Sequence, residues 1–344
     1  MAYTTINKST DYFNTLLYTG NDGTGRSITG VGFQPDFVWV KDRSNSYDHG
    51  LFDAVRGATK ALNSNDASAE DTISNSLTAF GSDGFTAGAN TIINGNNNNY
   101  ASWNWKANGT GSANTAGSIN STVSANTTSG FSIVKYTGTG ANATVGHGLG
   151  VAPKMIHVKG LGNANNWLSG GTNISSTWAS SLHLNTIASI DTYAYWQNQI
   201  PNANTFAIGS DGALNQNGIE NIAYCFADVQ GYSKFGSYTG NGNADGPFVY
   251  TGFKPSFVMI KLSTAADDWQ IFDNKRNTFN IMDKYLRPNS PLTDITNAVI
   301  DFTSNGFKLR SSAGSFNPSG ATAIYMAFAE APLVGSNNVP ANAR

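Results

Sequence analysis

Apolar residues recur along the chain in short runs, and one of these runs occurs twice in nearly the same form. Residues 32–41 read GFQPDFVWVK, and residues 252–261 read GFKPSFVMIK. After the proline, both runs are apolar on both faces of an extended chain, which is typical of a strand inside a sandwich. The run VIDFTSNGFKLR instead alternates apolar and polar residues on either side of an Asn-Gly pair, which predicts a hairpin.

These runs belong to a longer unit that recurs at fixed spacing along the chain. Tyr18 and Tyr238 open similar YTGN segments 220 residues apart, and an FD-x-x-R motif recurs at the same spacing. A fainter middle copy opens at Tyr136 and repeats the ten-residue run as GVAPKMIHVK, 118 residues beyond the first copy. The segments GSDGF (81–85), GSDGA (209–213) and TSNGF (303–307) correspond between the copies and predict turns.

The pattern predicts an all-β protein of three tandem β-sandwich repeats, jelly-roll-like and of about 100 residues each. Residues 1–108 are the first repeat with an N-terminal attachment segment, 131–230 a divergent second repeat, and 231–344 the third repeat with an extended C-terminal tail. Residues 109–130 carry few apolar side chains and are predicted to be a flexible or surface-laid linker. Tandem sandwiches of this kind are expected to form a stiff rod or a tripod-like spike.

Composition supports the all-β class and argues against several functions. Charged residues make up 12% of the chain, and 20 basic against 22 acidic side chains leave a net charge of −2. This balance disfavours binding to nucleic acid or to an anionic membrane surface. No apolar run approaches the roughly 20 residues needed to cross a bilayer, and no secretion signal is visible. The single cysteine, Cys225, lies in an apolar run and is interpreted as a small buried filler.

The most conspicuous charged motif is FD-x-x-R, which pairs Asp53 with Arg56 and Asp273 with Arg276. An aspartate and an arginine near an aromatic side chain could bind sugar hydroxyls. Duplication at a fixed register instead favours a structural ion pair that holds a turn. We therefore interpret both motifs as structural repeat pairs.

No motif for catalysis or metal binding stands out in the sequence. Glycoside hydrolysis needs two carboxylates about 5 to 10 Å apart, and no acidic residue lies in a recognisable motif for it. The 4 histidines have no G-x-S-x-G partner, and no calcium loop or metal-ligand spacing is present. We predict a protein that is not an enzyme, with no catalytic residue, no metal site and no cofactor.

The stretch IDTYAYWQNQIPN (190–202) is peculiar to the middle copy. A feature that departs from a repeat is a better candidate for function than one that follows it. Aromatic side chains beside Asn- and Gly-rich loops are suited to sugar recognition, although core packing is the alternative for each tryptophan. The candidate contacts to a ligand or receptor are Trp178, Tyr193, Tyr195 and Trp196.

Several runs together resemble one known family, among them TTINKSTDYFNTLLYTGNDG, GFQPDFVWVKDRS, WQIFDNKRN and IYMAFAEAPLVGS. They are similar to repeat-containing virion structural proteins of tailed, notably marine, bacteriophages, which are often labelled tail fibre-like. The resemblance covers nearly the whole chain apart from residues 109–130 and the C-terminal tail. It supplies no catalytic residues, and the middle copy departs from the repeat by lacking FD-x-x-R.

The resemblance implies a virion surface protein on the tail or capsid exterior, made in the host cytoplasm, and most directly a tail fibre or receptor-binding component in host attachment. The implied partners are other virion proteins, a host cell-surface glycan or protein, and further copies of the chain, with a trimer as first expectation. Neither nucleic acid nor membrane insertion is expected. The alternatives are a capsid-attached fibre or decoration protein, a lectin-like carbohydrate-binding module, and a depolymerase.

Overall fold

The computed structural model describes residues 3–334 of the chain. Strands hold 43% of the residues and helices 3%, and the sheets are antiparallel, so the all-β prediction is confirmed. The short helices are η1 (Ser9–Asp11), α1 (Thr91–Asn94) and α2 (Gly212–Asn215). Within the described residues, none of them has the length or apolar character to span a lipid bilayer.

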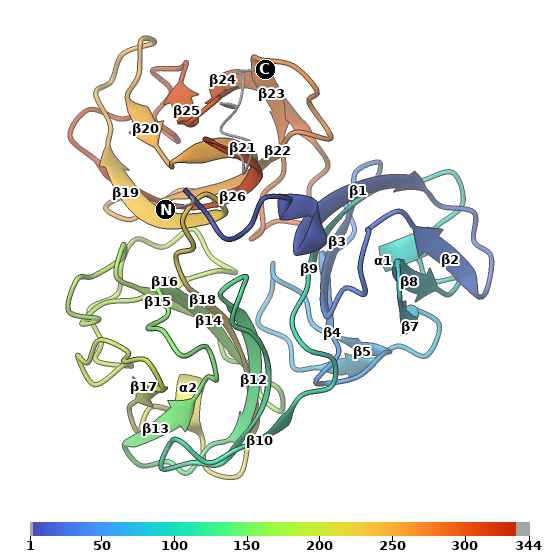
Figure 1. Ribbon diagram of the computed structural model, residues 1–344, viewed down its shortest axis with the longest axis vertical. Helices are drawn as coiled ribbons and strands as arrows, with labels where there is room; N and C mark the ends of the chain where they lie inside the picture. The colour runs from blue at the N-terminus through green and yellow to red at the C-terminus, as the bar shows by residue number, and fades with distance from the viewer. Residues whose placement is uncertain (1–2, 335–344) are drawn as a thin grey trace.

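The strands form three lobes around a common centre (Figure 1). We call them unit 1 (β1 to β9, blue to teal), unit 2 (β10 to β18, green to yellow) and unit 3 (β19 to β26, orange to red). Each unit turns one sheet toward the centre of the molecule and carries a second sheet outside it. The arrangement is a ring around a pseudo-threefold axis, whereas tandem sandwiches in a rod would lie end to end.

The inner sheets share one strand order, and we use this order to match positions between the units. In unit 1 the order β1-β9-β3-β4 joins Phe13–Thr19, Asn99–Trp105, Phe37–Asp42 and Gly50–Asp53. In unit 2 the strands β12-β18-β14-β15 are Phe131–Thr137, Glu220–Phe226, Met155–Gly160 and Leu168–Gly171. In unit 3 the strands β19-β26-β21-β22 are Ser233–Thr239, Thr322–Pro332, Phe253–Leu262 and Gln270–Asp273.

The outer sheets differ between the units. Unit 1 has β2 (Arg26–Thr29), β8 (Gly84–Ala87) and β7 (Leu77–Gly81), and a separate pair of β5 (Lys60–Ala61) and β6 (Asp71–Thr72). Unit 3 has β20 (Phe248–Tyr250), β25 (Gly306–Leu309), β24 (Ile295–Thr303) and β23 (Met282–Tyr285). The outer sheet of unit 2 has only β13 (Ala143–Gly146) and β17 (Thr205–Ile208), while β16 (Leu182–His183) adds to its inner sheet.

Strand β3 explains why the repeated ten-residue run is apolar on both faces. Val38 and Val40 point between the two sheets of unit 1 and belong to the core of that unit. Phe37 and Trp39 point the other way, into a cluster that contains residues of all three units, which we call the central core. Alternate side chains of one strand therefore fill two different cores, and no position of β3 is left for a solvated residue.

Aromatic rings of all three units interlock in the central core. The rings of Phe37 of unit 1 and Tyr224 of unit 2 are stacked with centroids 4.2 Å apart. The rings of Phe13 of unit 1 and Phe328 of unit 3 are stacked at 4.9 Å. Since each unit covers the inner sheets of the other two, an isolated unit would expose a large apolar face to water.

The predicted linker is instead part of unit 2. Residues 109–130 contain β10 (Ser112–Asn114) and β11 (Ser121–Asn126), which extend the inner sheet beyond β12 into a seven-stranded sheet. Ile119 and Val123, two of its few apolar side chains, are buried in the core of unit 2. The linker prediction was wrong because the backbone pairing of an added sheet edge needs little apolar sequence.

One of the three turn segments, that of unit 2, differs from the sequence prediction. Asp83 lies in the hairpin turn between β7 and β8, as predicted. Asp211 in the similar GSDGA segment instead caps α2, where its side chain accepts from the Ala213 backbone N–H. Its structural counterpart in unit 1 is Asn90, which caps α1 in the same way. The same residue types suit a turn and a helix cap, so their order alone does not distinguish the two.

A buried lysine ends the repeated run in every unit. Lys41, Lys159 and Lys261 are fully buried, and each ammonium donates to two backbone carbonyls, one of the last residue of its strand and one of the loop that follows. Burial lowers the pKa of each of these lysines to about 8. The lysine therefore closes the loop that leads each unit toward its neighbour.

Candidate functional site

The units are joined by the same hydrogen bond at all three interfaces. His49, Trp167 and Trp269 occupy equivalent positions, at the spacing of the repeat. Each ring nitrogen bonds to a backbone carbonyl of the neighbouring unit: His49 Nε2 to Arg287 O (3.0 Å), Trp167 Nε1 to Asn63 O (2.8 Å) and Trp269 Nε1 to His183 O (3.0 Å). The bonds run from unit 1 to unit 3, from unit 2 to unit 1 and from unit 3 to unit 2. This head-to-tail arrangement closes a ring.

An asparagine orients each of these three residues. Asn65, Asn185 and Asn289 accept a hydrogen bond from the backbone N–H of His49, Trp167 and Trp269 at 2.9, 3.0 and 2.8 Å. Nδ1 of His49 also accepts from the indole N–H of Trp39, so the other ring nitrogen carries the proton that it donates to unit 3. The sequence shows the spacing of these residues, but it does not show that they face a neighbouring unit.

The first FD-x-x-R motif lies at the interface between units 1 and 2. Arg56 Nε donates to Asp53 Oδ2, and both side chains are essentially inaccessible to water. The hydroxyl of Tyr224 of unit 2 donates to the same carboxylate oxygen at 2.8 Å. Glu70 accepts a further bond from Arg56 at 3.3 Å. The motif therefore holds a neighbouring unit as well as its own turn.

The second FD-x-x-R motif makes the equivalent contact between units 3 and 1. Arg276 Nε donates to Asp273 Oδ2 at 2.6 Å, and the indole N–H of Trp103 of unit 1 donates to this oxygen at 3.1 Å. The guanidinium of Arg276 also lies 5.6 Å from the centroid of the Trp103 ring. Asp294 of unit 3 accepts from both Arg276 and Arg43 of unit 1, which extends the contact to the surface.

Among the described residues, the interface between units 2 and 3 has neither this ion pair nor an aromatic side chain that donates to it, although Trp269 still donates to His183 O there. The positions that match Asp53 and Arg56 hold Gly171 and Ile174, and Ile174 packs against the central core. The position that matches Tyr224 and Trp103 is Met326, a member of the central core. Both sides of the polar contact have thus been replaced by apolar groups, so no buried charge is left without a partner.

A histidine lies in the central core close to this apolar interface. His157 matches Trp39 and Met259 in the inner sheets, and its ring lies 6.3 Å from that of Trp269 of unit 3. Its Nδ1 is 2.7 Å from the Ser169 hydroxyl, while its Nε2 is buried without a hydrogen-bond partner among the described residues. Burial lowers the pKa of His157 to about 3, so the ring is neutral at ordinary pH.

The four candidate contact residues of the middle copy differ in how far they are exposed to solvent. Trp178 and Trp196 are fully buried in the core of unit 2, with ring centroids 5.2 Å apart, so the expectation that they contact a ligand is wrong. Tyr195 is partly buried, and its hydroxyl donates to Asp191 at 3.0 Å. Tyr193 is 54% exposed and lies at the molecular surface. The tryptophans anchor the segment that presents Tyr193.

Tyr193 lines a hollow of about 570 Å³ on the outside of unit 2. We call it the Tyr193 hollow; its lining residues come from three segments: Asn142, residues 192–198 and residues 209–211. Tyr193 and Tyr195 have ring centroids 4.8 Å apart, so the neighbouring ring supports Tyr193. The sequence could locate this segment because it interrupts the repeat, but it could not tell the exposed ring from the buried ones.

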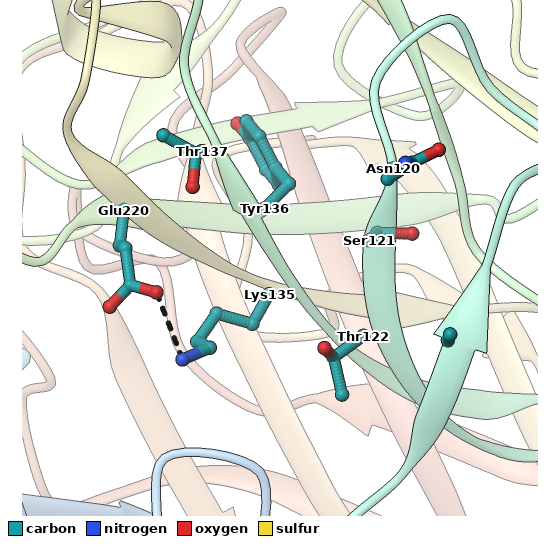
Figure 2. A pocket seen from close by; sticks show the side chains of 8 residues that line it. Asn120, Ser121, Thr122, Lys135, Tyr136, Thr137 and Glu220 are labelled. Atoms are coloured by element: carbon teal, nitrogen blue, oxygen red, sulfur yellow. Dashed lines mark ion pairs between the residues drawn. The ribbon is translucent and has the colours of Figure 1, made fainter.

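A second hollow, of about 310 Å³, lies where β10 and β11 widen the inner sheet of unit 2. Figure 2 shows Lys135 and Glu220 pointing toward each other there, and their ion pair measures 3.0 Å. Glu220 is the only carboxylate among the residues that line this hollow, and Asp211 is the only one that lines the Tyr193 hollow. Neither hollow therefore presents the pair of carboxylates used in glycoside hydrolysis.

Cys225, His49 and His147 are buried within the fold. The thiol of Cys225 lies in the core of unit 2, and burial raises its pKa. Burial also lowers the pKa of His49 and His147, whose rings bond to backbone carbonyls. Within residues 3–334, histidine, cysteine and acidic side chains form no group of three that could hold a metal ion.

The N-terminal segment lies against unit 3. Ile6 is buried in the central core, the Thr4 hydroxyl donates to Gln230 O at 2.6 Å, and the Tyr3 hydroxyl donates to Gly252 O at 2.6 Å. Residues 3–6, expected as part of an attachment segment, therefore join unit 1 to unit 3 within the molecule. The expected C-terminal tail falls mostly at residues 335–344, outside the described residues.

Comparison with known proteins identifies a family. The profile of a family described as a domain of unknown function, DUF7483, matches residues 8–332. The match covers nearly the whole chain, so the chain belongs to this family. No curated protein and no solved structure matches the chain.

Proposed function

We propose that the chain is a non-enzymatic structural protein of a bacteriophage particle, exposed on its surface as a tail fibre or receptor-binding component. We further propose that its three units are jelly-roll-like sandwich repeats. The observation that carries the proposal is the closed ring, because the buried ion pairs and ring donors of the described residues join one repeat to the next. Polar chemistry used in this way stabilises an assembly and leaves little for catalysis.

The surface chemistry is consistent with this role. The chain has few charges and many Asn, Ser, Thr and Gly residues, and the hollows of unit 2 are lined by polar side chains. Its proposed partners are other virion proteins and a host cell-surface glycan or protein. One chain already surrounds a pseudo-threefold axis, so we propose that a single chain supplies the threefold arrangement that fibres obtain from a trimer.

Immunogold electron microscopy of purified phage particles tests the location. We expect an antibody to this chain to label the tail, with particles from a phage lacking the gene as the unlabelled control. Label spread over the head would make the chain a capsid decoration protein, and absence of label and of its peptides from purified particles would overturn a virion role.

An assay for reducing ends tests the non-enzymatic part of the proposal. We expect no release of reducing ends from host polysaccharide incubated with the purified chain. Release that is abolished by substituting a carboxylate of the chain would contradict it and favour a depolymerase.

A further inference from the structure

We infer that the Tyr193 hollow is a binding site for a neutral pyranose, and that it is the part of the surface that contacts the host receptor. The sugar site stands on the geometry of the hollow, while its role as a receptor site rests on the proposed function. Tyr193 is the aromatic face of the site, since it is half exposed and is supported from one side by Tyr195. An apolar ring face exposed beside polar groups suits the alternating apolar and hydroxyl surfaces of a sugar.

The polar lining of the hollow offers unused hydrogen-bonding groups. Four of its side chains make no hydrogen bond with any other described residue: Asn142, Thr192, Asn198 and Ser210. Amides and hydroxyls can each donate and accept, as the hydroxyls of a sugar do. Such a set fits a ligand with many hydroxyl groups and no net charge.

The charges near the hollow select against acidic sugars. Asp211 is the only charged residue that lines the hollow, and no lysine or arginine is among the lining residues. Asp191 lies just behind, where it accepts from the Tyr195 hydroxyl and from the backbone N–H of Tyr193. A sialic or uronic acid would bring its carboxylate toward two carboxylates of the protein, and like charges at short range repel.

The segment that forms the hollow is held in one conformation. The side-chain amide of Gln197 donates to Ala143 O at 3.0 Å and to Ile208 O at 2.7 Å. The indole N–H of Trp196 donates to the Ser181 hydroxyl at 2.8 Å. Gln197 and Asn198 adopt left-handed backbone angles, with φ of 55° and 54°, and these bonds maintain that conformation. A site that is already formed loses less conformational entropy when a ligand binds.

The hollow occurs where unit 2 departs from the other two units. Units 1 and 3 continue their outer sheets with β7 and with β24 and β23, whereas unit 2 stops at β17. The segment 190–202 occupies the chain length between β16 and β17. Unit 2, which lacks the Asp–Arg ion pair, therefore also has the smallest outer sheet and carries the Tyr193 hollow.

Saturation-transfer NMR on the full chain tests the site, with methyl glycosides of glucose, galactose and mannose as neutral probes and methyl glucuronide as the acidic probe. We expect transfer to at least one neutral glycoside, no transfer to the glucuronide, and about tenfold weaker binding by Tyr193→Ala. Tyr250→Ala is the matched control, because Tyr250 is 55% exposed and also lines a hollow, in a different unit. It should bind like the unchanged chain.

Three results would overturn the site: no transfer to any neutral glycoside, preference for the glucuronide, or equal weakening by the two tyrosine substitutions. The location experiment fails separately from this one. Sugar binding by a chain that is absent from the particles would leave the site in place and remove the virion role. Labelled particles whose chain binds none of the probes would keep the virion role and remove the site.

Discussion

Two of the three unit interfaces are built on a buried ion pair, and the third is built without one. Asp53 and Asp273 each hold an arginine of their own unit and an aromatic donor of a neighbouring unit. The interface between units 2 and 3 has Gly171 and Met326 at the matching positions. All three interfaces nevertheless keep the ring-to-carbonyl bond of His49, Trp167 or Trp269.

The comparison shows that the ring-to-carbonyl bond is common to all three interfaces, whereas the buried ion pair can be replaced by apolar groups. A buried charge without its partner is costly, whereas replacing a whole buried ion pair by apolar groups can be nearly neutral. The loss of Asp and Arg from unit 2 therefore goes together with an apolar Met326 in unit 3. The ring-to-carbonyl bond has no such apolar alternative, because the backbone carbonyl remains whatever side chain faces it.

The largest expected effect comes from breaking one ion pair on one side only. Among the described residues, Asp53→Ala leaves buried Arg56 with Glu70 as its one carboxylate partner, and we expect a loss of about 3 kcal/mol in the free energy of unfolding. Urea unfolding followed by tryptophan fluorescence measures it. Asp71→Ala, at an exposed position of the same unit, should change the unfolding free energy by less than about 0.5 kcal/mol.

A second variant gives the interface between units 1 and 2 the residue types found between units 2 and 3, which sharpens the comparison. The triple variant Asp53→Gly, Arg56→Ile and Tyr224→Met removes both sides of the polar contact. We expect it to lose less than half as much unfolding free energy as Asp53→Ala alone. A triple variant that is less stable than the single one would show that the ion pair itself, rather than an unpaired charge, determines the stability of the interface.

Acid should weaken the apolar interface through His157. Its folded pKa of about 3 lies below the usual value of 6.5, so the unfolded chain binds more protons between these two pH values. Stability should therefore be complete above pH 6.5 and fall on acidification, by about 2 kcal/mol between pH 6.5 and 4.5 for this group. His157→Met, which copies Met259, should remove this part of the pH dependence. An unchanged slope in the variant would contradict the assignment.

A smaller effect is expected from removing one ring donor. Trp167→Phe keeps an aromatic ring but leaves Asn63 O without the N–H of Trp167, and we expect a loss of about 1 to 2 kcal/mol. Trp269→Phe should lose a similar amount at the interface that has no ion pair. Thermal unfolding of both variants checks this, and a loss at only one interface would contradict the equivalence of the three bonds.

The smallest effect is expected at the surface site. Tyr193→Ala should change the free energy of unfolding by less than about 0.5 kcal/mol, because its ring is half exposed and takes no part in an interface. Urea unfolding measures this together with the variants above. A loss comparable to that of Trp167→Phe would show that Tyr193 holds the fold, and would weaken the case for a ligand site.

The strands of each unit can be predicted from the sequence because their signals lie within a few neighbouring residues and recur in each repeat. The constant spacing from Tyr18 to Tyr238 locates equivalent strands, and the predicted hairpin forms with Asn305 in its turn and Gly306 at the start of β25. Short-range signals of this kind depend on turn chemistry and on side-chain alternation. They give the strands of each unit without giving the contacts between units.

The packing of the three units into a ring and the position of the Tyr193 hollow could not be predicted from such local signals. Both Trp103 and Trp178 are fully buried, yet Trp103 donates to Asp273 of another unit and Trp178 fills the core of its own unit. Which face of a strand meets a neighbour depends on how whole units pack, and no local pattern encodes it. Edge strands such as β10 escape detection for a related reason, since backbone pairing rather than apolar content builds them.

The closed ring also has a consequence for how the protein responds to concentration. In a homotrimer with the same contacts, dilution would separate the subunits, because each association costs translational freedom. Here the peptide chain keeps the three units within reach of one another, and linked modules experience effective concentrations on the order of millimolar. The threefold arrangement should therefore persist for a single molecule at any dilution, and an opened interface can close again without waiting for a partner.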